Sequence, residues 1–259
     1  MSLIINGIER DKLIIDKNVY KFAHTWFNMA SANAQNAQYR GASLGAFTED
    51  YATKIKYGIF DAMQVGDTFT QNGHTYKIGG FNYLCGADNN PNLGNHLIMI
   101  TDNLTNREMN PSNTTNGGFA GSKMWKSYFP TVVEQLKTDF GDHLLTWNEF
   151  LTTGTDGSGA ADQGEYSAVQ ASMMNNVMYW GAPTSYSTPY NGTNYNTGIE
   201  TKQLPIMKLH TDEQKNGGNW AWLRDICNSS GFAYADGDGS ADWTPASTSN
   251  DVRAFFLID

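Results

Sequence analysis

The sequence predicts an α+β protein, rich in loops, in which two helices pack on a small, mostly antiparallel sheet. Three observations support this prediction. The chain of 259 residues contains 26 glycines together with many asparagines, serines and threonines, which favours turns over a helical bundle. Short alternating apolar runs indicate strands, and helical apolar spacing is confined to a few stretches. The C-terminal end carries two aromatic, apolar segments separated by a polar run.

The length suits one elaborate domain with a small N-terminal appendage. We expect an arm and linker over residues 1–47 and the main domain over residues 48–259. Within the arm, Leu3-Ile4-Ile5 and Leu13-Ile14-Ile15 alternate with charged turns, which indicates a small hairpin. Two roles fit the arm: attachment or oligomerisation, or simply added strands for the main domain. Residues 21–47 are small and polar, and predict a linker or a weak helix.

The next part of the chain predicts one helix, one hairpin and one buried strand. Tyr51, Ile55, Ile59 and Met63 recur at helical spacing, although Gly58 interrupts them. Asn-Gly between alternating β-formers is a strong hairpin signal. The expected elements are a helix over 50–63, hairpin strands over 68–70 and 75–78 around Asn72-Gly73, continued strand over 81–84, and a buried strand over 96–100.

Two further helices are predicted in the middle of the chain. One begins at the cap residue Ser122 and ends at Gly141, with aromatic and aliphatic residues on one face. The second runs from about Tyr166 to Tyr179, with Val169, Met173 and Val177 facing inward. Polar, glycine-rich composition predicts loops over 103–121, 152–164 and 181–200, and a short apolar run predicts a strand over 204–209.

The stretch from Gly217 to Asp259 predicts a buried frame that carries an exposed surface. Its two apolar segments can bury area, whereas the residues between them have few groups able to build a core. We expect the arginines to make buried, charge-assisted bonds to carbonyls or Asp side chains. The predicted frame residues are Trp220, Trp222, Arg224 and Arg253.

The polar run over residues 228–251 is the candidate binding surface. Rigid aromatics among small polar residues are typical of binding surfaces, although Tyr234 and Trp243 also fit partly buried turn positions. The candidate ligand-binding residues are Tyr234, Asp236, Asp238, Ser240, Asp242, Trp243, Ser247, Thr248 and Asn250.

These same segments carry a family resemblance. WLRD (222–225), FAYADGDGSA (232–241) and ASTSNDVRAFFLI (246–258) resemble the C-terminal signature of C-type-lectin-like domains in phage and prophage proteins of Gram-positive bacteria. Upstream, MNPSNTTNGGFAGSKM (109–124), FGDHLLT (140–146) and QLPIMKL (203–209) extend the resemblance, which covers roughly Val65 to the end. Where that family has Gly-Val-Arg-Pro, this chain has Asp251-Val252-Arg253-Ala254.

The resemblance implies a C-type-lectin-like fold in which the arginine-bearing segments are core strands and the polar run faces a ligand. It also implies a virion protein that recognises a host cell-surface protein or glycan, as do the variable proteins of diversity-generating retroelements. Such proteins are commonly trimeric, and the N-terminal arm would contact other virion proteins. Two alternatives remain: a structural head-fibre, decoration or baseplate protein, and a carbohydrate-active enzyme.

Motifs for metal or covalent chemistry are weak in this sequence, and we expect no catalytic residue, metal or cofactor. Asp236, Asp238, Ser240 and Asp242 alternate as in a calcium loop, but the EF-hand glycine and glutamate are missing, which favours a free acidic turn. The calcium-dependent sugar-binding motifs of lectins are also absent. The five histidines are scattered without zinc-site spacing. Cys85 and Cys227 are expected to be free thiols, with a bridge between them as the alternative.

Charge and hydropathy narrow the class of partner. The net charge is −9 and no basic stripe exists, so we expect no binding to nucleic acid or anionic membrane. No apolar run is long enough for a membrane span. The N-terminus lacks the features of a secretory signal peptide, so we expect synthesis in the host cytoplasm and a final location in the virion.

Overall fold

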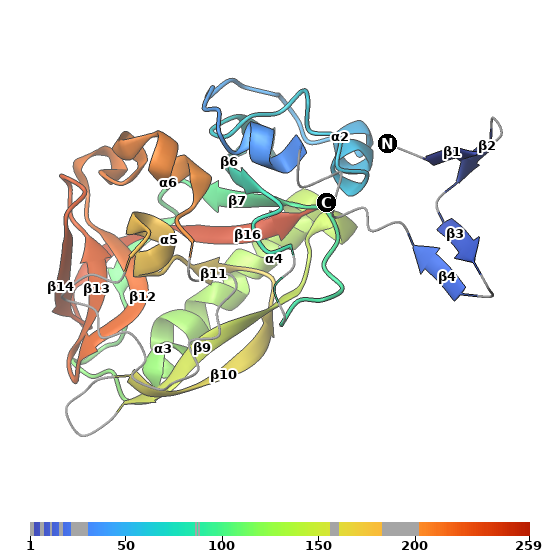
Figure 1. Cartoon of the computed structure of the whole chain (residues 1–259). Helices are drawn as coiled ribbons and strands as arrows, with labels where there is room; N and C mark the ends of the chain where they lie inside the picture. Colours follow the sequence, from blue (N-terminus) through green and yellow to red (C-terminus); the bar gives the residue numbers. More distant parts are fainter. Residues whose placement is uncertain are drawn as a thin grey trace.

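The computed structural model of the chain has an α+β architecture in which sheets predominate and helices are few (Figure 1). The structure describes the paired strands within residues 3–21, and residues 31–85, 87, 89–155, 161–182 and 202–259. Among the strand pairs it describes, one alone is parallel, β12 (Ala221–Asn228) with β15 (Ser249–Val252). The predicted α+β class with a mostly antiparallel sheet is therefore confirmed.

The central sheet contains five strands in the order β11-β16-β7-β6-β5. β7 and β16 lie side by side in the middle of the body (Figure 1), and every residue in both strands is buried. Continuous burial is expected where a strand is covered on both faces, so the predicted buried strand over 96–100 is confirmed. The five strands are β11 (Ser172–Met173), β16 (Ala254–Ile258), β7 (Leu97–Thr101), β6 (His74–Phe81) and β5 (Thr68–Gln71).

The hairpin predicted around Asn72-Gly73 is confirmed as β5 and β6. Asn72 and Gly73 have φ angles of 49° and 86°. Positive φ at both central residues is what a type I′ turn requires, and Asn-Gly tolerates it best. The strand ends at Phe81, not at Leu84 as predicted, because the chain turns at Asn82, whose φ is 51°.

The long helix predicted from Ser122 is confirmed. A π-helical turn, η1 (Met124–Tyr128), continues into α4 (Phe129–Phe140), and Ser122 Oγ accepts a hydrogen bond of 3.1 Å from the Trp125 N–H. The helix ends at Gly141, where φ is 54°. Its last residue, Phe140, packs on the central sheet, with its ring centroid 5.1 Å from that of Tyr76.

A second helix, α2 (Glu49–Lys56), begins near the predicted position but is shorter than predicted. Gly58 adopts a φ of 69°, which ends the helix there, and the side chain of Ile59 is exposed. Tyr51 attaches the helix to the central sheet through an edge-to-face contact with Phe69, with centroids 4.9 Å apart.

The second five-stranded sheet has the order β14-β13-β12-β15-β8 and holds most of the C-terminal polar run. Two short connections pass between the two sheets, one from β7 to β8 and one from β15 through Arg253 to β16. The crossings are joined by hydrogen bonds from Leu104 N to Val252 O and from Ala254 N to Thr101 Oγ1, both 2.9 Å. The strands not yet bounded are β14 (Ala241–Pro245), β13 (Gly231–Ala235) and β8 (Thr105–Glu108).

The predicted loop over 103–121 is wrong at two places, because it contains β8 and the short helix α3 (Gly118–Gly121). The predicted loop over 152–164 is also wrong. Its described residues belong to the antiparallel pair β9 (Trp147–Thr155) and β10 (Ala161–Val169); residues 156–160 lie outside the described residues. Gly164 lies in β10 although glycine is a weak strand former, and the position requires glycine because a Cβ atom there would lie 2.3 Å from the Phe150 ring.

The helix predicted from Tyr166 to Tyr179 is wrong over most of its length. Residues 166–169 are in β10, Ser172 and Met173 form β11, and the helix is confined to α5 (Asn176–Trp180). Apolar residues four apart fit a helix and an alternating strand equally well, so the spacing did not discriminate between them. Asn175 caps α5, its Oδ1 accepting a bond of 2.8 Å from Met178 N.

The strand predicted over 204–209 is likewise wrong, because Pro205–Leu209 forms α6. Proline at the first helical position favours this outcome, and a six-residue apolar run has no decisive periodicity. Within the predicted loop over 181–200, residues 183–200 lie outside the described residues. Three short 3-10 turns complete the described elements: η2 (Gly141–His143), η3 (Thr211–Glu213) and η4 (Asn216–Gly218).

The N-terminal arm contains two hairpins where one was predicted. The antiparallel pairs are β1 (Leu3–Ile5) with β2 (Ile8–Arg10), and β3 (Lys12–Ile15) with β4 (Asn18–Lys21).

Residues 21–47 were expected to form a linker or a weak helix, and of these the structure describes residues 31–47. Residues 31–35 are helical, and Ala32 and Phe47 are buried in the core. Arg40 forms an ion pair of 2.5 Å with Asp67, whose side chain is fully buried. Since a buried carboxylate needs such partners, this segment is part of the main body and not a spacer.

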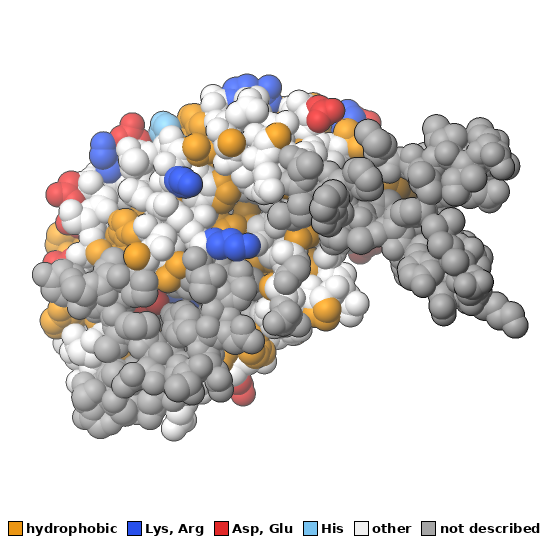
Figure 2. Space-filling view, in the orientation of Figure 1, with side chains coloured by type: hydrophobic (Ala, Val, Ile, Leu, Met, Phe, Trp, Pro, Cys, Tyr) orange, Lys and Arg blue, Asp and Glu red, His pale blue; other side chains and the backbone are white. Residues whose placement is uncertain are grey.

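The described residues contain no helix long and apolar enough to cross a bilayer. On the face shown in Figure 2, Lys and Arg side chains are scattered among polar and apolar side chains and form no stripe.

Candidate functional site

Arg224 is buried between β12 and the β9–β10 hairpin, as expected for a frame residue. Its Nη1 donates to the Phe150 carbonyl at 2.8 Å, and its Nη2 lies 3.0 Å from Oε1 of Glu149, whose side chain is fully buried. The predicted charge-assisted bonds are confirmed, although the acidic partner is a glutamate and not an aspartate.

Arg253 occupies the crossing between the two sheets. Its Nη2 lies 2.8 Å from Glu213 Oε2, and its Nη1 donates to the Glu213 carbonyl, also at 2.8 Å. Lys77 lies 3.0 Å from the other oxygen of the same carboxylate. Burial raises the pKa of the nearby Tyr179 hydroxyl, so Tyr179 stays a neutral donor to the Glu213 and Gln214 carbonyls. Arg253, the second predicted frame arginine, therefore connects η3 to the start of β16.

The two tryptophans predicted to belong to the frame differ in burial. Trp222 is 1% exposed, and its Nε1 donates to the Arg107 carbonyl at 2.8 Å, so its predicted burial is confirmed. Trp220 is 49% exposed, so its assignment to the core is wrong. It lies directly before β12, two residues after the turn η4, and its ring packs on Tyr234 at a centroid distance of 5.0 Å.

The predicted exposed loop over 228–251 is largely sheet. β13, β14 and β15 run through it, joined by turns over 236–240 and 246–248. Tyr234 is wrongly predicted as exposed: it is 6% exposed, because β13 is an inner strand with every residue buried. Asn250 was also predicted to be exposed, but its side chain is 1% exposed. Successive residues of a strand point to opposite faces, and Asn250 takes the inward position between Ser249 and Asp251.

Trp243 remains at the surface and is 37% exposed. Its ring lies across Gly231, where an added Cβ would come within 2.6 Å of Trp243 Cε3. Among the remaining candidate residues, Asp238, Ser240 and Ser247 are exposed and Asp236, Asp242 and Thr248 are half-buried.

The acidic stretch over 236–242 forms a closed turn. Asp236 Oδ1 accepts from Ser240 N at 2.9 Å, and Asp238 Oδ1 accepts from Ser240 Oγ at 2.5 Å. The bond from the Ser240 hydroxyl lowers the pKa of the Asp238 carboxyl. Trp180 Nε1 connects the turn to α5 by donating to the Gly239 carbonyl at 2.9 Å. Within the described residues, no group of three or more His, Cys, Asp or Glu is arranged to hold a metal ion.

Ser247 and Thr248 are held by side chains on neighbouring elements. Ser247 Oγ donates to Asn113 Oδ1 at 2.5 Å, and Thr244 Oγ1 donates to Thr248 Oγ1 at 3.0 Å. The nine predicted binding residues are therefore not gathered in one cleft: seven lie on turns or the outer sheet surface, and two are in the core.

A small cleft lies beside Trp220, where η4, the start of β12, β15 and β8 meet. Its volume is about 280 Å³, and we call it the Trp220 cleft. It is lined by Asn106, Gly218, Asn219, Trp220, Ser249, Asn250 and Asp251. Asp251 accepts hydrogen bonds from three amides: Asn103 Nδ2 at 2.5 Å, Asn106 Nδ2 at 3.1 Å and Asn216 Nδ2 at 3.3 Å.

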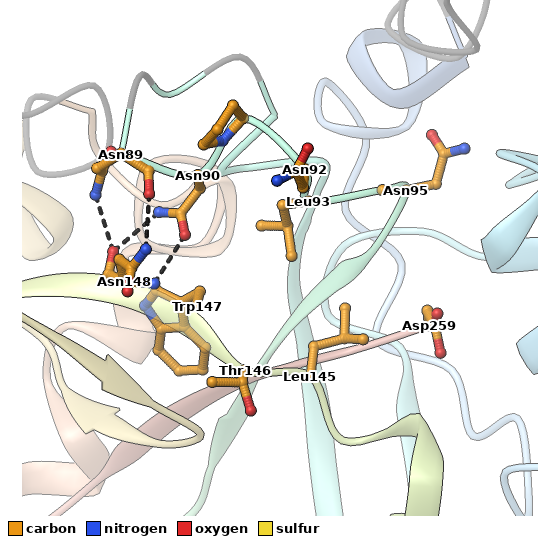
Figure 3. A pocket seen from close by; sticks show the side chains of 12 residues that line it. Asn89, Asn90, Asn92, Leu93, Asn95, Leu145, Thr146, Trp147, Asn148 and Asp259 are labelled. Atoms are coloured by element: carbon orange, nitrogen blue, oxygen red, sulfur yellow. Dashed lines mark hydrogen bonds between the residues drawn. The ribbon is translucent and has the colours of Figure 1, made fainter. Parts of the chain in front are cut away.

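A larger cleft of about 430 Å³ lies between residues 89–95, the start of β9 and Asp259 (Figure 3). On one side of this cleft, Asn148 bonds to both Asn89 and Asn90. Asn90 donates to the Asn148 carbonyl at 2.9 Å and accepts from the Asn148 N–H at 2.8 Å. Trp147, which forms one wall, is 2% exposed and offers little ring surface to a ligand. We therefore place the candidate site at the Trp220 cleft and the adjoining Trp243 surface.

The cysteines are free, so the predicted absence of a bridge is confirmed. Burial raises the pKa of the Cys85 thiol to about 11 and also raises that of Cys227, next to Asp225 and Asp242. Both thiols are therefore protonated near neutral pH, which is unfavourable for a nucleophile.

No protein family, characterised protein or solved structure matches this chain.

Sequence reasoning missed five residues of the Trp220 cleft: Asn106, Gly218, Asn219, Ser249 and Asp251. Asn106, Ser249 and Asp251 lie in stretches predicted as loop, and the other two had no assigned role. Asn106 comes from β8, more than a hundred residues upstream. The one local signal was Gly217-Gly218 directly before Asn219 and Trp220, because paired glycines mark a sharp turn and such a turn can leave a following tryptophan exposed.

Proposed function

We propose that this protein is a virion component that recognises a ligand on a host cell surface through its C-terminal sheet. The observation that carries the proposal is the pair of exposed tryptophans, Trp220 and Trp243, on a sheet anchored by the buried Arg224 and Arg253. Aromatic side chains held rigidly at a surface are typical anchors of binding interfaces, because they bury large area with little loss of conformational entropy. The resemblance to phage proteins supports the cell-surface ligand and the virion location.

The proposed fold is C-type-lectin-like. Two features support it: WLRD lies in the inner strand β12, and the residues after Arg253 form the fully buried strand β16. The proposed role is recognition without catalysis, supported by the protonated, partly buried thiols and by the closed hydrogen bonding of the acidic turn.

The experiment is a cell-binding assay with fluorescently labelled protein on a panel of Gram-positive bacterial strains. The wild-type protein is compared with Trp220→Ala and Trp243→Ala, and with Tyr57→Ala as a matched control, because Tyr57 is 55% exposed and lies at the end of α2. We expect the wild type and the control to bind at least one strain, and at least one tryptophan variant to lose about tenfold or more in affinity. Thermal unfolding should be nearly unchanged in all three variants, since exposed substitutions usually cost within about 0.5 kcal/mol.

Equal binding by the wild type and both tryptophan variants would overturn the proposed site. If the wild type binds no strain, and the protein is instead found in stoichiometric amounts in particles whose adsorption does not require it, the alternative of a structural virion protein takes its place.

A further inference from the structure

We propose that Arg107 and Asn250, which pair across the antiparallel ladder of β8 and β15, form a binding site for a carboxylate group of a ligand. Directly opposite side chains on such a ladder lie on the same face of the sheet, with Cβ atoms about 4.5–5.5 Å apart. β8 is the outermost strand of its sheet. The inference goes beyond the proposed function, because it involves neither of the two exposed tryptophans.

The first argument is the unbalanced charge of Arg107. Arg40, Arg224 and Arg253 each form an ion pair with a buried carboxylate, at 2.5, 3.0 and 2.8 Å. Among the described residues no carboxylate pairs with Arg107, and its Nε is buried without a hydrogen-bond partner. The side chain is otherwise only half-buried, so its terminal Nη atoms remain open to a ligand. A buried donor without an acceptor is costly, and this favours the binding of an acceptor here.

The second argument is the donor on the opposite strand. The Asn250 side chain is 1% exposed, and its Nδ2 has no hydrogen-bond partner in the part of the chain that the structure describes. Arg107 and Asn250 therefore place two unpartnered donors on one face of the sheet. A carboxylate has two oxygens that only accept hydrogen bonds, so a single carboxylate can satisfy both donors.

The third argument is that Arg107 is already held in place. Its Cζ lies 4.2 Å from the centroid of the Tyr128 ring, so the guanidinium group packs on an aromatic face. Its carbonyl accepts a hydrogen bond of 2.8 Å from Trp222 Nε1. The carboxylate of the neighbouring Glu108 pairs with Lys123, at 2.8 Å. A guanidinium group in a fixed position loses little conformational entropy on binding, and its planar fork matches a carboxylate.

A carboxylate fits this site better than a phosphate group. Arg107 supplies one unpaired positive charge, which balances the single charge of a carboxylate. A phosphate monoester carries nearly two negative charges at neutral pH, and Asn250 adds donors but no charge. Because the net charge of the protein is −9, an excess of negative charge on the ligand would be repelled.

The test is a titration of the intact, isotope-labelled protein with sodium acetate at constant ionic strength, followed by NMR. The Trp222 Nε1–H signal is the reporter, because this group donates to the Arg107 carbonyl and is present in every variant. We expect acetate to shift the signal saturably, with a dissociation constant in the millimolar range. Acetamide has the shape of acetate without its charge, and it should leave the signal unchanged.

Four variants locate the site. Arg107→Met keeps the aliphatic contact with Tyr128 but removes the charge, and it should bind acetate about tenfold or more weakly. Arg107→Lys keeps the charge without the planar fork, so it should retain part of the affinity and tests the site even if Arg107→Met fails to fold. Asn250→Ala should weaken binding about fivefold. Lys56→Met is the matched control, because it removes the same charge from an exposed position at the end of α2.

Equal acetate affinity in the wild type and in either Arg107→Met or Asn250→Ala would overturn the inference, and so would an equal response to acetamide. Tighter binding of inorganic phosphate than of acetate would also overturn it, because the site would then select another class of anion. The cell-binding assay with the tryptophan variants does not depend on these results, so this inference and the proposed function can fail separately.

Discussion

Arg224 and Glu149 form a buried ion pair, and its energy depends on both partners being present. Replacing one partner leaves an uncompensated charge in the core, which costs more than the pair itself contributes. We predict that Arg224→Met and Glu149→Leu each lower the free energy of unfolding by about 3–5 kcal/mol. The double variant should lose less than either single variant, because no buried charge is left. Urea unfolding of all four proteins measures this coupling, and simple additivity of the two losses would contradict it.

His96 is a buried histidine whose protonation can be tested through the pH dependence of stability. The Leu84 N–H donates to its Nε2 at 3.1 Å, so the ring proton is on Nδ1, which donates to the Gly94 carbonyl at 2.9 Å. Burial lowers the pKa of His96 to about 4, while the bond to Gly94 acts in the opposite direction. The folded protein therefore holds a neutral imidazole across a pH range in which an unfolded histidine is charged.

The sign of the pH effect follows from this difference. Between pH 6.5 and 4 the unfolded state binds more protons than the folded state, so stability falls as the pH is lowered. We predict that His96 contributes a loss of about 3 kcal/mol between pH 7 and pH 4. His96→Gln keeps one donor and one acceptor but cannot titrate, so it should remove this contribution to the pH dependence of the free energy of unfolding. Parallel pH profiles for the two proteins, measured by chemical unfolding, would show that the prediction is wrong.

At the scale of elements, Asp139 connects α4 to the β5–β6 hairpin. Its carboxylate accepts from Asn72 Nδ2 at 2.8 Å and from the Tyr76 hydroxyl, and it lies 2.8 Å from His74 Nδ1. Burial and the bond to Asp139 raise the pKa of Tyr76, so the hydroxyl remains a donor. A single buried side chain thus satisfies two partners on β6 and one at the turn of the hairpin.

We predict that Asp139→Asn lowers the free energy of unfolding by about 2–4 kcal/mol, because its amide N–H₂ would face donors that then lose their acceptor. Asp142→Asn is the matched control, since Asp142 is exposed three residues later and should change stability by less than about 0.5 kcal/mol. Thermal unfolding compares the two, and equal melting temperatures would refute the role given to Asp139.

At the scale of the whole molecule, we predict that the N-terminal arm mediates assembly into a trimer. Each cell-surface contact can then be weak, because parallel contacts supply avidity. A chain that lacks residues 1–21 should keep its thermal unfolding transition, since residues 31–47 with the Arg40–Asp67 ion pair remain. Its mass by light scattering should fall from that of a trimer to that of a monomer. An unchanged oligomer, or a wild-type protein that is already monomeric, would exclude the arm as the assembly element.

Local patterns in the sequence were sufficient for several features of this protein. The Asn72-Gly73 hairpin, the helix ending at Gly141 and the buried strand over 96–100 all depend on neighbouring residues alone. Turn-forming residues, the residues that start and stop helices, and continuous apolar runs act over a few residues. A single segment of the chain is therefore enough to predict the elements that they form. The burial of Trp222, Arg224 and Arg253 was also predicted, because they sit within or next to strongly apolar runs.

Only the tertiary structure decided which side chains are covered by residues distant in sequence. Tyr234 and Asn250 lie within the largely polar run over 228–251, yet neighbouring strands enclose them, whereas Trp220 lies next to an apolar segment and stays half exposed. The Trp220 cleft needs β8, η4 and β15 together, and strand pairing over a separation of more than a hundred residues leaves no trace in local composition. Burial depends on which elements meet in space, and therefore the sequence determined the elements better than it determined the site.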